Sequence, residues 1–132
     1  MKKVLATILA LVMAIGLCSV SWATAPASVN SADALKSAIE TGGAITLSGN
    51  IEVSQALSVS KKVTIDLNGQ TITGKNGEYG CRVFNVVAGG SLTLTGSGTI
   101  TTANQNDTTT FPDNSSVIRV GDNTNGAACG LV

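Results

Sequence analysis

The sequence predicts an all-β protein, a solenoid of three parallel sheets with one short helix at its N-terminal end. A phrase in which Leu-x-Gly is followed by a short Ile-centred strand occurs three times. Short runs around these phrases alternate apolar residues with Thr, Ser or Asn, which is the pattern of half-buried strands. Aromatic residues make up only 3% of the 132 residues, and 15 are glycines. Short strands of this kind bury their apolar faces by stacking on the equivalent strand of the next repeat.

The first residues predict a Sec-type signal peptide over 1–23, and hence a bacterial protein that is secreted or held at the cell surface. A positively charged start precedes the apolar run 4–20, and Ser21-Trp22-Ala23 offers small residues for cleavage. A membrane anchor is the alternative, but a spanning helix needs about 20 apolar residues, so the mature chain is expected to have no span. Lipidation of Cys18 is disfavoured, because Leu17 stands where a lipobox requires a small residue.

Residues 24–29 are expected to be a small-residue linker, and a short amphipathic helix of about ten residues follows it. Asn30 or Ser31 can act as the N-cap, and Asp33 lies in the first turn, where a negative charge suits the helix dipole. One face of the helix is apolar and consists of Leu35, Ala38 and Ile39. The helix is expected to end at Gly42 and Gly43.

The remaining chain divides into coils, a coil being one set of three successive strands. The expected strands are Ile45–Leu47, Ile51–Val53 and Leu57–Val59 in the first coil, Val63–Leu67, Thr71–Thr73 and Phe84–Val86 in the second, and Leu92–Leu94, Thr99–Thr101 and Ile118–Val120 in the third. Asp66 is expected on the outer face as a solubilising charge. A β-sandwich with the same strand spacing is the alternative fold, and a disordered Ser/Thr/Gly tract is disfavoured by the regular Leu and β-branched positions.

The phrase Ile65–Gly74, with the helix Ala34–Glu40 and the stretch Gly43–Ile51 before it, resembles the N-terminal part of right-handed parallel β-helix proteins of the pectin-lyase-like superfamily. The resemblance covers residues 29–132. It implies that 30–132 form an N-terminal cap and about three coils, with the helix covering the open mouth of the β-helix.

The superfamily includes polysaccharide lyases, hydrolases, adhesins and structural modules, so fold alone leaves the function open. The chain has no histidine, which removes the Gly-His-Gly segment of polygalacturonase-type sites, and it lacks the carboxylate pattern of pectate-lyase-type calcium sites. We therefore expect a non-catalytic adhesion, glycan-contact or envelope module, with no cofactor. The alternative is the N-terminal portion of a polysaccharide lyase or hydrolase, and a third possibility is a remnant without a stable fold. Formal net charge is zero, so no basic field attracts nucleic acid.

The connections between second and third strands indicate one candidate contact surface. They lengthen from Ser54–Ala56 in the first coil to Gly74–Arg82 in the second and Ala103–Ser115 in the third, always at the same corner. Insertions at one corner of a stacked repeat form a rim on one side. The candidate glycan or partner rim is Lys75, Asn76, Glu78, Tyr79, Arg82, Asn104, Asn106, Asp107, Asp113 and Asn114. The alternative is that these are ordinary solvated loop residues, with Glu78 and Arg82 paired.

Two further expectations concern the cysteines and the C-terminal residues. Export permits a disulfide between Cys81 and Cys129, with two free thiols as the alternative. The segment 122–126 has oxygen ligands at alternate positions, but an Asx turn is favoured over a calcium loop there. Residues 130–132 look like the first strand of a fourth coil, which suggests the N-terminal part of a longer, truncated protein.

Overall fold

A computed structural model describes residues 24–76, 79–103, 116–121 and 130–131, and these form one short helix and three sheets of short strands. The first sheet has the order β1 (Ala27–Val29), β2 (Gly43–Leu47), β5 (Lys62–Asp66), β9 (Ser91–Thr95) and β12 (Gly130–Leu131). The second has β10 (Thr99–Thr102), β6 (Thr71–Asn76) and β3 (Ile51–Val53), with β7 (Tyr79–Gly80) on β6. The third has β11 (Ile118–Val120), β8 (Phe84–Val86) and β4 (Leu57–Val59).

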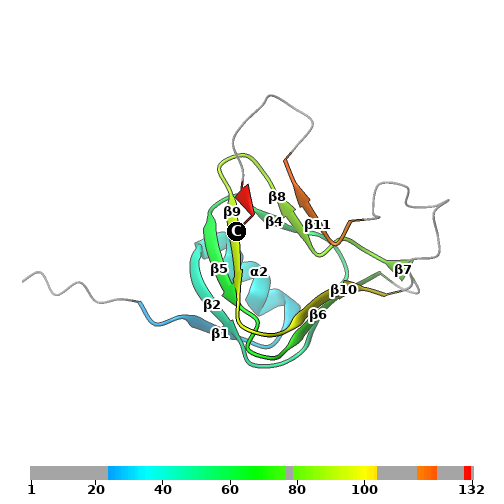
Figure 1. The fold of residues 1–132 in the computed structure, drawn as a ribbon, viewed down its shortest axis with the longest axis horizontal. Helices are drawn as coiled ribbons and strands as arrows, with labels where there is room; N and C mark the ends of the chain where they lie inside the picture. The colour runs from blue at the N-terminus through cyan, green and yellow to red at the C-terminus, as the bar shows by residue number, and fades with distance from the viewer. Residues whose placement is uncertain (1–23, 77–78, 104–115, 122–129, 132) are drawn as a thin grey trace, which may run out of the picture.

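The chain visits the three sheets in the same order in every coil. It runs β2, β3, β4, then β5, β6, β8, then β9, β10, β11, and β12 returns to the first sheet. All strand pairs are parallel except β6 with β7. Figure 1 shows the sheets surrounding a shared interior. The predicted strand positions are confirmed, and the architecture is mostly β and compatible with a parallel β-helix.

Equivalent side chains of successive coils form columns that fill the interior. On the first sheet, Ile45 pairs with Ile65 and Ile65 with Leu94, so one inward position carries Ile, Ile and Leu in succession. Leu57 pairs with Phe84 in the same way on the third sheet, and Phe84 is fully buried. Burying one such side chain contributes about 1.5–3 kcal/mol, so these columns are the main stabilising element.

Burial declines across the third coil, where the columns have less protein above them. Ile72 is 0% exposed in the second coil, but its register partner Ile100 is only partly buried. Val86 is 0% exposed and its partner Val120 is 42% exposed. Leu92, whose strand pairs with β12, is 0% exposed. An inward position is therefore sealed by the next strand in its column.

The helix α2 (Ala32–Thr41) covers one end of this interior, against β1 to β4. Its N-cap is Ser31, whose side chain accepts a hydrogen bond from the Ala34 N–H at 3.3 Å. Leu35 and Ile39 are buried against the strands. The expected helix and its apolar face are confirmed. Within the described residues no helix has the length and apolarity required to span a bilayer.

The stretch 24–29, which the sequence analysis treats as a linker, contains a strand. β1 pairs in parallel with β2, Val29 is 4% exposed, and the Val29 carbonyl accepts a hydrogen bond from the Ser48 N–H at 2.8 Å. Only three residues pair, and their composition of Ala, Ser and Val gives little alternation to detect. The free backbone edge of β2 is what orders them. The expected signal peptide lies outside the described residues.

Side chains at the corner between the first and second sheets join one coil to the next. The Asn68 side-chain amide donates to the Leu47 carbonyl at 2.9 Å, and the Asn50 side-chain oxygen accepts from the Thr71 N–H at 2.8 Å. Asp66 is half-buried here, and its Oδ1 accepts from the Asn68 N–H at 3.0 Å. Asp66 therefore shapes the turn as well as carrying charge.

Candidate functional site

The candidate site lies at the corner between the second and third sheets, where the second coil leaves the stack. In the second coil, β6 continues past its partners and turns back as β7, with Lys75 opposite Gly80 and Asn76 opposite Tyr79. This antiparallel hairpin projects away from the three sheets in Figure 1. Lys75 and Asn76 are both exposed. The corner therefore presents a polar strand tip, fixed by backbone pairing.

The base of the hairpin is closed by the backbone of the third coil. The Gly74 carbonyl accepts hydrogen bonds from the Cys81 N–H at 3.3 Å and from the Ala103 N–H at 2.9 Å. Glycine is required at Gly74 and at Gly80, because a Cβ atom at either position would overlap a backbone carbonyl oxygen, that of Cys81 or Ala103. The second coil thus leaves the stack beside Ala103 of the third coil.

The return path is also shared between the two coils. The Val117 carbonyl accepts from the Val83 N–H at 2.9 Å and from the Phe84 N–H at 3.3 Å. The half-buried Arg82 donates from Nε to the Ser116 Oγ at 3.4 Å. The described residues that flank the two connections are therefore hydrogen-bonded to each other, Gly74 with Ala103 and Arg82 with Ser116, so both connections begin and end at one corner.

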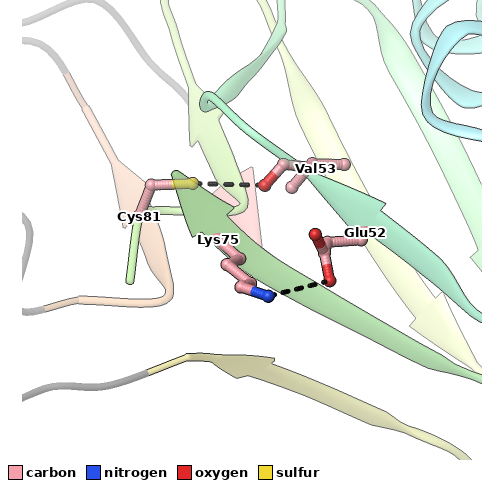
Figure 2. Close-up of polar contacts among 4 residues, drawn as sticks. All are labelled: Glu52, Val53, Lys75 and Cys81. Carbon is pink, nitrogen blue, oxygen red and sulfur yellow. Dashed lines mark hydrogen bonds and ion pairs between the residues drawn. The ribbon is translucent and has the colours of Figure 1, made fainter. Parts of the chain in front are cut away.

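One ion pair ties the hairpin to the first coil. Lys75 Nζ lies 4.0 Å from Glu52 Oε2, from neighbouring strands of the second sheet (Figure 2). The side chains are 43% and 61% exposed, so water screens the pair and it contributes less than about 1 kcal/mol. The Lys75 ammonium stays accessible to a ligand.

Cys81 is a buried cysteine at the same corner, with no disulfide partner among the described residues. Its Sγ donates a hydrogen bond to the Val53 carbonyl at 3.3 Å, as Figure 2 shows. Burial raises the pKa of the thiol, and a backbone hydrogen bond opposes that shift. The thiol is therefore neutral and unreactive at pH 7. Cys129 lies outside the described residues, so a Cys81–Cys129 disulfide stays a prediction.

The structure places four of the predicted rim residues, and it brings them together along the hairpin and its return. Lys75 and Asn76 are on β6, Tyr79 is on β7, and Arg82 follows. Arg82 bonds to Ser116, whereas the expected Glu78 pairing cannot be placed. Outside the described residues lie Glu78, Asn104, Asn106, Asp107, Asp113 and Asn114. The segment 122–126 lies there too, and the described part of the chain has no group of three metal-ligating side chains.

The sequence analysis misses two features of this corner. One is the hairpin itself, which the dipeptide Asn76-Gly77 could have indicated, because Asn-Gly favours tight antiparallel turns. The other is a hollow of about 370 Å³ between α2 and the short first-coil corner. Asp33, Lys36 and Glu40 line it from the helix. Their spacing places them along one side of a helix, a signal readable from the sequence.

In comparisons with known proteins, no family model, curated protein or solved structure matches this chain.

Proposed function

We propose that this protein is a secreted or cell-surface parallel β-helix of the pectin-lyase-like type, and that it acts without catalysis as a glycan-contacting module. The architecture is supported by parallel strands in register on three sheets, visited in the same order in each coil. Export is supported by the composition of residues 1–23.

One observation carries the contact function. At this corner the second coil departs from the stack as a paired hairpin, while the first coil crosses the same corner with only Ser54–Ala56 between strands. The departure exposes a cation at Lys75 and an amide at Asn76, and it adds Tyr79 to the hairpin. Sugar hydroxyls bind such donors and acceptors, and an aromatic ring suits the flat face of a pyranose. Binding groups are commonly carried on loops that a rigid frame positions.

A glycan array followed by titration of the best ligand tests this contact. The variant Lys75→Ala/Asn76→Ala should bind about tenfold more weakly, because each lost hydrogen bond contributes about 0.5–1.5 kcal/mol. Lys62→Ala is the matched control, since Lys62 is an exposed lysine on the first sheet, away from the corner. Equal binding by the double variant and the control would disprove the rim.

Export and absence of catalysis have their own tests. N-terminal sequencing of protein recovered from the medium or envelope should begin at Thr24, and a product retaining Met1 would contradict the signal peptide. Incubation with polyuronides should release no unsaturated or reducing ends. Release of either product by the purified protein would replace this proposal with the polysaccharide lyase or hydrolase reading.

A further inference from the structure

A hollow of about 370 Å³ lies on the same corner as the hairpin, one coil closer to the helix. One wall is α2, with Asp33, Lys36 and Glu40. The other wall is the first-coil corner, with Ser54 and Gln55. The hollow exists because this corner is short, and because Ala32 and Ala56 at its margins have small side chains.

The floor of the hollow is apolar and rigid. Ile39 of the helix lines it, together with Val53 and Leu57 of the adjoining strands. These three side chains are between 1% and 6% exposed, so they belong to the core as well as to the floor. A preformed apolar floor beneath a few polar groups is the usual composition of a small-ligand site, for which volumes start at about 300 Å³.

The polar groups around this floor are available to a ligand. Among the described residues, Asp33, Lys36 and Glu40 form no ion pair with one another, and the ion pair present is that of Lys75 with Glu52. Ser54 and Gln55 are exposed and add a hydroxyl and an amide. The lining includes two carboxylates and one ammonium, so its formal charge is −1.

Size and charge together select the ligand class. The volume is at the low end for ligand sites, which suits one sugar residue rather than an oligosaccharide. Hydroxyl groups can pair with Ser54 and Gln55. The net negative charge favours a ligand ammonium and repels a ligand carboxylate.

We propose that the hollow binds one amino-sugar residue of a glycan, with the sugar ammonium attracted by the carboxylates of both Asp33 and Glu40, and that it rejects uronates. This inference rests on the proposed glycan contact and names a subsite at the helix end of that corner. The hairpin and the hollow are separate surfaces, so each can be tested without the other.

The test is an amide chemical-shift titration of the isotopically labelled protein with a glucosamine tetramer, and with a galacturonate tetramer as the comparison. The glucosamine tetramer should shift amides of 33–40 and 54–58, and the galacturonate tetramer should leave them unchanged. Glu40→Gln should weaken binding up to about fivefold, as expected for one exposed charge pair. Asp66→Asn removes one negative charge away from both the hollow and the hairpin and keeps a side-chain oxygen for the Asn68 N–H, and it should bind like the wild-type protein.

The inference would be overturned by equal binding of both tetramers, by equal weakening in Glu40→Gln and Asp66→Asn, or by the absence of shifts at 33–40 and 54–58. Shifts confined to 75–82 would reject the hollow and support the hairpin contact. Shifts confined to the helix and the first corner would support the hollow and reject the hairpin. Gln55→Ala, which leaves the helix unchanged, should also weaken binding of the glucosamine tetramer, and unaltered binding would count against the hollow.

Discussion

The substitution Gly74→Ala should open the corner from which the hairpin departs. Gly74 is buried on β6, and an added Cβ would overlap the Cys81 carbonyl oxygen and lie 3.2 Å from Val83 Cγ2. The first of these atoms belongs to the backbone and cannot rotate away. The chain must therefore separate where the Gly74 carbonyl holds the N–H groups of Cys81 and Ala103.

The expected loss can be summed from its parts. Overpacking in a filled interior costs about 1–3 kcal/mol. Weakening two backbone hydrogen bonds adds about 0.5–1.5 kcal/mol for each bond. Alanine restricts the unfolded chain more than glycine does, and this offsets the loss of stability by about 0.4–1 kcal/mol. The free energy of unfolding should thus fall by about 1–5 kcal/mol, with a midpoint near 3 kcal/mol.

Gly69→Ala is the matched control, because it isolates the effect of backbone conformation. Gly69 has φ +77°, and a Cβ there would meet nothing within 4 Å. Its cost should be about 1 kcal/mol, from the left-handed conformation alone. Urea unfolding followed by far-ultraviolet circular dichroism measures both variants, and it suits a chain whose one tryptophan, Trp22, lies in the expected signal peptide. A Gly74→Ala loss no larger than that of Gly69→Ala would refute the reasoning.

Three further predictions use the same unfolding assay. Ile72→Ala should cost about 2–5 kcal/mol because its site is fully buried, and Ile100→Ala on the partly exposed third coil should cost clearly less; equal losses would contradict the burial gradient. Ser31→Ala should cost about 1 kcal/mol by removing the hydrogen bond to the Ala34 N–H, and Ser31→Asn should restore most of it; an unchanged Ser31→Ala would contradict the cap. Burial raises the pKa of the Cys81 thiol in the folded protein, so the thiol's contribution to stability is complete below the unfolded thiol pKa and is lost as the pH rises through the folded pKa. The free energy of unfolding should therefore decrease less at alkaline pH in Cys81→Ala than in the wild-type protein. An equal decrease in both proteins would exclude the thiol as its cause.

The strands could be predicted because their determinants are local and repeated. Ile72 pairs with Ile51 of the first coil and with Ile100 of the third, so the isoleucine of the repeated phrase stays in register. Leu94, in contrast, pairs with Ile65 rather than with Leu67. β1 could not be predicted, because its order comes from the free edge of β2 rather than from its own residues. The hollow requires two elements to be placed in space, and no single segment of the sequence encodes its volume.

Two hydrogen bonds to the Gly74 carbonyl, from the Cys81 and Ala103 N–H groups, fix the base of the hairpin on the stack. Beyond this point the chain returns through one short antiparallel pair, so replacing the residues between Asn76 and Tyr79 leaves the interior columns untouched. We therefore expect that a foreign peptide can be inserted at this corner while the three sheets keep their fold.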